Sequence, residues 1–104
     1  MASGGAVNAY SSSASVGTVD TVWISQPANV VVVTNDSGTA PIWFTVGSPG
    51  GPDLQPTVGG ANCHCAASVA GTSVKVSSDG MFGSIINLTS TGTPLYTVSI
   101  QESL

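Results

Sequence analysis

The chain has 104 residues, which is enough for one globular domain and too few for two. Charged residues make up only 6% of it, against roughly a quarter in an ordinary globular domain. Lys75 is the only lysine or arginine in the sequence. Binding to nucleic acid or to an anionic membrane surface depends on clustered lysine and arginine, so both functions are excluded.

The paucity of charge also predicts how the surface is used. With a formal net charge of -4 and few ionic side chains, the surface must consist mainly of Ser, Thr, Gly, Asn and Ala. Such side chains lose less rotamer entropy on burial than Lys and Glu do. Because a freely soluble protein usually carries more charge, the composition favours a component of an assembly.

Residues 1–17 are small and polar without a period, and they predict a flexible N-terminal arm. They lack a basic region followed by an apolar core, so we expect no secretory signal and synthesis in a reducing cytoplasm. Val7 and Tyr10 are the anchors that would order the arm against a partner. The alternative is a frayed tail with no partner.

From Thr18 onward, β-branched or alternating segments lie between Gly- and Pro-rich turns. No stretch has a helical period, and no run approaches the roughly 20 apolar residues that span a bilayer. The pattern predicts an all-β fold, a single β-sandwich over residues 18–104, immunoglobulin-like or jelly-roll-like, with seven to eight strands. The segments predicted as strands are 18–25, 29–35, 40–47, 61–68, 72–77, 81–90 and 94–101.

Two of these segments predict which faces are covered. The apolar run "VVVV" (30–33) suits a strand covered on both faces. In 40–47, alternation places Ile42, Phe44 and Val46 on one face and Trp43 on the other. We expect the indoles of Trp23 and Trp43 to be buried, because aromatic rings dominate burial in small domains. The alternative leaves Trp43 exposed as a platform for a sugar or a partner.

The segment "NCHCAA" (62–67) holds both cysteines and the only histidine. In a strand, Cys63 and Cys65 point to one face and His64 to the other. The three side chains therefore cannot share one metal ion, and a Cys–His catalytic pair would need the histidine beside the thiol. We expect Cys63 and Cys65 to be free thiols in the core, and His64 to face solvent or a partner.

No other motif carries catalysis. The five carboxylates lie mostly at predicted turns, where Asp is favoured for backbone reasons. The chain has no G-x-S-x-G elbow, and its glycine-rich segment 47–60 lacks the Lys-Ser/Thr of a phosphate loop. We therefore expect no enzyme, with no catalytic, cofactor-binding or metal-binding residue and no cofactor.

Four segments are informative when taken in chain order: "VVVVTNDSGTAPIWFTVG", "PTVGGANCHCAA", "VKVSSDG" and "SIINLTSTGTPLYTVSI". Together they resemble small β-rich virion proteins, which tailed bacteriophages, particularly those of actinobacteria, encode among their structural genes. The resemblance covers residues 18–101, although residues 69–76 have an Ala-Gly turn where a Pro-Ala-Gly turn is expected. It implies a head decoration or minor structural protein and assigns no catalytic residue.

Composition and resemblance together predict a capsid decoration or cement protein on the virion surface, made in the host cytoplasm. Its expected partners are the major capsid protein and neighbouring copies of itself, in a symmetric homo-oligomer on the shell. The candidate partner contacts are Val7, Tyr10, His64 and Trp43. The alternatives are a carbohydrate- or cell-surface-binding β-sandwich module and a tail or connector component.

Overall fold

The computed structural model describes residues 9–26, 28–80 and 83–101. These residues form an all-β sandwich, as predicted, with eight strands at the upper limit of the expected number. Apart from β1, each strand falls within or beside a segment predicted from the sequence. The strands are β1 (Ala9–Ser13), β2 (Asp20–Ile24), β3 (Ala28–Asn35), β4 (Ile42–Gly47), β5 (His64–Ala66), β6 (Thr72–Gly80), β7 (Ser84–Ser90) and β8 (Leu95–Gln101).

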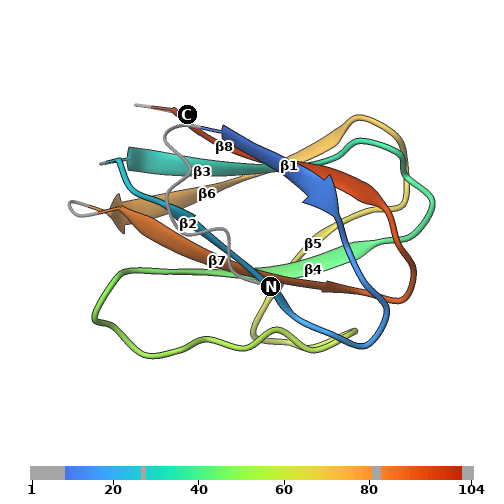
Figure 1. Cartoon of the computed structure of the whole chain (residues 1–104), viewed down its shortest axis with the longest axis horizontal. Coiled ribbons are helices and arrows are strands. Elements are labelled where there is room, and N and C mark those ends of the chain that lie inside the picture. Colours follow the sequence, from blue (N-terminus) through green and yellow to red (C-terminus); the bar gives the residue numbers. More distant parts are fainter. Residues whose placement is uncertain (1–8, 27, 81–82, 102–104) are drawn as a thin grey trace.

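The strands form two packed four-stranded sheets (Figure 1). The strand order is β1-β8-β3-β6 in the first sheet and β2-β7-β4-β5 in the second. The first strand pairs with the last, the second with the seventh, the third with the sixth and the fourth with the fifth, all antiparallel. This nested pairing is the jelly-roll arrangement, so the second of the two expected sandwich types is observed.

The core lies between the sheets and follows the alternation of each strand. On β4, Ile42 and Phe44 are buried and Val46 packs against them, which confirms the predicted inner face. Full burial of an apolar side chain such as Ile42 or Phe44 contributes about 1.5–3 kcal/mol to the stability of the fold. The other buried residues of the core are Ala14, Val22, Ile24, Val31, Val33, Ala66, Ile86, Leu88, Tyr96 and Val98.

Strand β3 is buried on both sides, as its apolar run predicted. Val31 and Val33 face the core, whereas Val30 and Val32 alternate with them and are still only 2% and 8% exposed. The strand lies inside the first sheet, between β8 and β6. Lys75 stands in register beside Val32, where the aliphatic stem of a lysine can cover an apolar neighbour.

The predicted boundary of the N-terminal arm is wrong for residues 9–17. Residues 9–13 form β1, which pairs with the C-terminal strand β8 in continuous register. Ala14 is buried, and Val16 forms an isolated bridge to Ser90 although its side chain is exposed. A serine-rich edge strand needs no apolar side chains, because backbone hydrogen bonds hold it. Residues 1–8, with Val7, and the side chain of Tyr10 lie outside the described residues.

One end of the sandwich is closed by Asn35, the last residue of β3, which is fully buried. Its Nδ2 donates to the carbonyl oxygens of Ala40 at 2.8 Å and Ala67 at 3.1 Å. Its Oδ1 accepts from the backbone N–H of Gly38 at 2.9 Å. Gly38 has φ of +66° and passes so close to Ala70 that a Cβ would overlap its backbone nitrogen. One amide therefore fixes two neighbouring turns.

Candidate functional site

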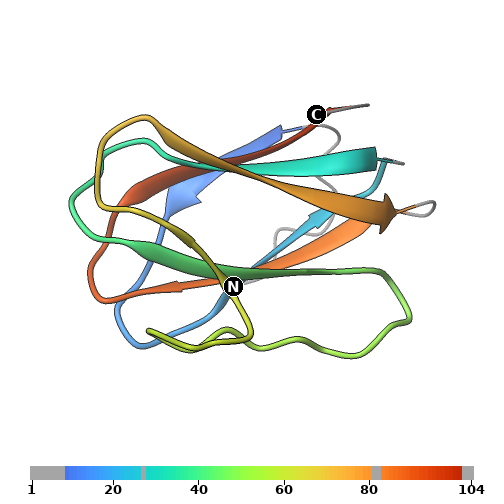
Figure 2. The same ribbon diagram turned by 180° about the vertical axis from the view of Figure 1, so that it is seen from behind.

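A long segment, residues 48–63, forms a third layer over the outer face of the second sheet (Figures 1 and 2). It is attached to the sheet at Leu54, whose carbonyl oxygen accepts two hydrogen bonds. One comes from Thr45 Oγ1 on β4 at 2.5 Å and the other from Asn87 Nδ2 on β7 at 2.7 Å. Because the segment covers them, these two outward-facing side chains are only 6% and 3% exposed.

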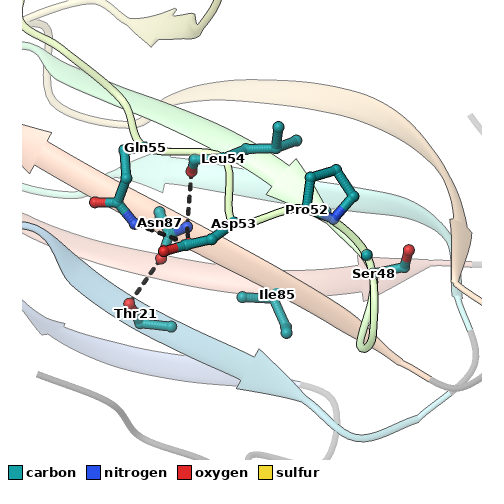
Figure 3. Close-up of a pocket in the computed structure, with 10 residues that line it drawn as sticks. Thr21, Ser48, Pro52, Asp53, Leu54, Gln55, Ile85 and Asn87 are labelled. Atoms are coloured by element: carbon teal, nitrogen blue, oxygen red, sulfur yellow. Dashed lines mark hydrogen bonds between the residues drawn. The ribbon is translucent and has the colours of Figure 1, made fainter.

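Asn87 links the segment to two strands (Figure 3). Its Oδ1 accepts from Thr21 Oγ1 on β2 at 2.7 Å, and its Nδ2 also donates to Asp53 Oδ1 at 3.2 Å. Gln55 Nε2 donates to the same carboxylate oxygen at 2.8 Å. The side chains of Asp53 and Gln55 are therefore held in place although both residues are exposed.

Between this segment and the sheet lies a groove of about 340 Å³, called the loop groove below. Apolar side chains of Ile85, Pro52 and Leu54 line it together with the polar groups of Asp53 and Gln55 (Figure 3). The chain's one cation is absent from the lining. The remaining lining residues are Thr21, Gly47, Ser48, Gly51 and Asn87.

A second hollow, of about 330 Å³, lies on the other side of residues 53–55 and reaches β5. His64 lines it, and its ring lies 5.3 Å from the ring of Phe44, centroid to centroid, with an angle of 38° between the planes. Asp53 and Gln55 line this hollow as well as the loop groove. The two polar side chains are thus reached from both sides of the segment.

The first sheet presents a different outer surface. Ser11, Thr97, Thr34 and Ser73 are neighbours in register across its four strands, and this row is called the hydroxyl face below. Thr97 Oγ1 donates to Asp36 Oδ2 at 2.6 Å, so in the 2.9 Å bond with Ser11 it accepts. Thr34 Oγ1 and Ser73 Oγ are 2.8 Å apart. The four hydroxyl groups are exposed or half-exposed.

The prediction that Cys63 and Cys65 lie in the core is wrong. Both thiols are free, but Cys65 is exposed on the outer face of β5 and Cys63 is only half-buried before the strand begins. Cys63 Sγ donates to the carbonyl oxygens of Thr57 at 3.4 Å and Gly60 at 3.3 Å. Desolvation by burial, and then the electrostatic effect of the neighbouring Cys63, raises the pKa of Cys65 above its ordinary value.

His64 is exposed, as predicted, but on the opposite face from the one expected. It shares its face of β5 with the buried Ala66 and contacts Phe44. The strand has only three residues and lies at the sheet edge. An inward side chain at its end therefore stays open to solvent.

The predicted burial of the two tryptophans is wrong for Trp23, which is 41% exposed on β2. Trp43 is half-buried and lies on the outer face of β4, in register with Thr89 and Cys65. Two candidate partner contacts, Trp43 and His64, thus lie on opposite faces of the second sheet. The structure does not bring them together.

Potential catalytic groups are scattered. Within the described ranges, no three His, Cys, Asp or Glu side chains gather where they could hold a metal ion. Asp20 lies on β2, within the predicted strand 18–25, where it is only 9% exposed and accepts a hydrogen bond from Tyr96 Oη at 3.3 Å. None of the described residues belongs to a helix long and apolar enough to cross a membrane.

No protein-family model matches this sequence, and no curated protein or solved structure matches it. The jelly-roll architecture occurs in viral capsid proteins, lectins and cupins. Since one fold serves many functions, function has to be inferred from the hydroxyl face and the loop groove.

Proposed function

We propose that this protein is a non-enzymatic structural component of a tailed-phage virion, which decorates the assembled capsid shell and docks through the hydroxyl face. The observation that carries the proposal is the row Ser11, Thr97, Thr34 and Ser73, four uncharged hydroxyl side chains that cross the whole first sheet. Two charged side chains flank the row: Lys75 on the same face of β6, and Asp36 beside Thr97. The sequence resemblance to small virion proteins supports the same assignment.

Such a surface suits docking for two physical reasons. Ser and Thr lose less rotamer entropy when covered than Lys or Glu. All four hydroxyl groups already hold a hydrogen bond to another side chain of the face, and Thr97 also donates to Asp36. A surface whose side chains are fixed beforehand loses less freedom on binding.

The size of the face predicts a weak contact repeated many times. Four strands about 4.8 Å apart and about six residues long at 3.3 Å each give a flat area of roughly 400 Å². A standard interface takes about 800 Å² from each partner. One copy is therefore held by shell and neighbours together, and the symmetry of the shell supplies avidity. The proposed partners are the major capsid protein and neighbouring copies of this chain.

The test is co-sedimentation of the purified protein with empty shells of the virion whose genome encodes it. We expect the Thr34→Glu/Ser73→Glu double variant to bind at least about tenfold more weakly, because it places two buried charges in the contact. The matched control is Thr91→Glu, at an exposed position away from the hydroxyl face. Deletion of residues 2–8 separately tests the predicted anchor Val7 and leaves β1 intact.

A double variant that is folded and sediments with shells as well as wild type would overturn docking through this face. Failure of the wild-type protein to sediment with shells would overturn the decoration role. Binding to isolated tails instead of shells would move the proposal to a tail component. Circular dichroism of each variant shows whether the sandwich is retained.

A further inference from the structure

We propose that the loop groove binds a neutral carbohydrate, a hexose or N-acetylhexosamine unit of a glycan. This inference goes beyond the decoration role and does not depend on it. The groove lies on the outer face of the second sheet, and the hydroxyl face lies on the outer face of the first. The two surfaces therefore point in opposite directions, and a copy docked on a shell would still expose the groove.

The size of the groove suits a small ligand. Ligand pockets usually measure about 300–1,000 Å³, and the loop groove, at about 340 Å³, is at the lower end. The second hollow begins on the other side of residues 53–55. One sugar ring fills the groove, and a longer glycan has room to continue over the segment.

The polar groups of the groove include some that the fold does not use. Asp53 Oδ1 accepts from Asn87 and Gln55, whereas no hydrogen bond within the described residues reaches Asp53 Oδ2. Gln55 uses Nε2 for that contact and leaves Oε1 unbonded within the same residues. Ser48 is a further polar residue of the lining. Sugar hydroxyl groups donate to a carboxylate or amide oxygen and accept from an amide N–H or a hydroxyl group.

These groups are also held in position before any ligand arrives. Asn87 is buried and fixes Asp53, and Asp53 in turn fixes Gln55. The attachment of Leu54 to β4 and β7 holds the backbone between them. Attachment of the segment explains the presence of Asn87 and Thr45, whose side chains hydrogen-bond within the fold. It does not explain Asp53 Oδ2 and Gln55 Oε1, which have no hydrogen bond within the described residues.

The apolar lining and the charge select the ligand class. Ile85, Pro52 and the 41% exposed Leu54 offer aliphatic surface to the C–H face of a sugar ring. Trp23, also 41% exposed, stands in register beside Ile85 on the same outer face and extends this surface. No Lys or Arg lines the groove to attract an anion. Apolar surface with a few fixed polar groups is the usual composition of a small-molecule site.

The test is a titration of the ¹⁵N-labelled full chain followed by NMR. The probes are glucose, galactose, mannose, N-acetylglucosamine and N-acetylgalactosamine, each up to about 10 mM, where a site with a Kd of about 1 mM is nine-tenths full. We expect at least one sugar to shift the side-chain amide signals of Gln55 and Asn87 and the indole N–H signal of Trp23. The Ser73 and Thr34 amides, on the other sheet, should stay unchanged.

Two variants assign the site, and one controls for them. Gln55→Ala and Asp53→Asn should each weaken binding at least about fivefold, because each removes a polar contact to the ligand. Asp53→Asn keeps an oxygen for the amides of Asn87 and Gln55, so the segment stays attached. The matched control Gln26→Ala removes an exposed amide elsewhere and should bind as wild type does.

The proposal is overturned if no sugar of the panel shifts the groove signals, or if Gln55→Ala and Asp53→Asn bind as tightly as the control. The outcome is separable from that of the decoration role. Shell co-sedimentation of Gln55→Ala should equal that of wild type, whether or not sugars bind.

Discussion

Replacement of Asn35 by alanine tests the reasoning about the closed end of the sandwich. The change removes three hydrogen bonds, to Ala40 O, Ala67 O and Gly38 N–H, from a residue with no exposed surface. A buried hydrogen bond contributes about 1 kcal/mol net, and a partner left unpaired costs about 1–3 kcal/mol. We expect the free energy of unfolding to fall by about 3–4 kcal/mol, a large part of the roughly 5–15 kcal/mol of a typical domain.

Urea unfolding followed by tryptophan fluorescence measures this loss. With an m-value of about 1.5 kcal/mol/M, the midpoint should fall by about 2 M. The matched control is Asn62→Ala, an exposed asparagine, which should stay within about 0.5 kcal/mol of wild type. If the free energy of unfolding of Asn35→Ala is within about 0.5 kcal/mol of the wild-type value, the amide does not hold the turns together. The account of this end of the sandwich is then wrong.

The remaining predictions concern one turn and one thiol. Gly38→Ala and Gly17→Ala change glycines of similar φ, +66° and +70°, but a Cβ meets backbone only at the first. In thermal unfolding, Gly17→Ala should cost about 1–2 kcal/mol and Gly38→Ala clearly more; equal costs would contradict the close approach to Ala70. Cys65→Ser should change the free energy of unfolding by less than about 0.5 kcal/mol, because the side chain is exposed. The raised pKa of Cys65 keeps its thiol protonated at neutral pH. Alkylation of Cys65, measured by mass spectrometry, should therefore be slow at pH 7 and faster at alkaline pH. Fast alkylation at pH 7 would contradict the raised pKa.

Strand positions were predictable wherever large apolar side chains alternate or cluster. In β4, Ile42 and Phe44 set the inner face and leave Trp43 outside. The same rule applied to β2 would have placed Trp23 outside, because Val22 and Ile24 occupy the inner positions. The size of the indole favoured burial of Trp23, whereas the alternation of β2 placed it outside, and the alternation was the correct guide.

Other features had no sequence signal. The one buried residue of β5 is Ala66, whose side chain is small. Side-chain size in "NCHCAA" therefore does not show which face of the strand points inward. Strand β1 is held by backbone pairing with β8, which side-chain patterns do not report. The loop groove depends on Asn87 reaching Asp53 and Leu54, more than thirty residues away along the chain. Such a contact follows only from the folded path of residues 48–63.

The nested strand pairing has a consequence for how the protein is made. Strand β8 lies between β1 and β3, so the first sheet cannot close before residues 95–101 have been synthesised. Until then, the valine-rich β3 has an open edge, which is a template for pairing with other chains. Contacts this distant along the chain also make folding slow compared with helical proteins of the same size. Production at high level should therefore yield more soluble protein at lower temperature, where translation and aggregation are both slower.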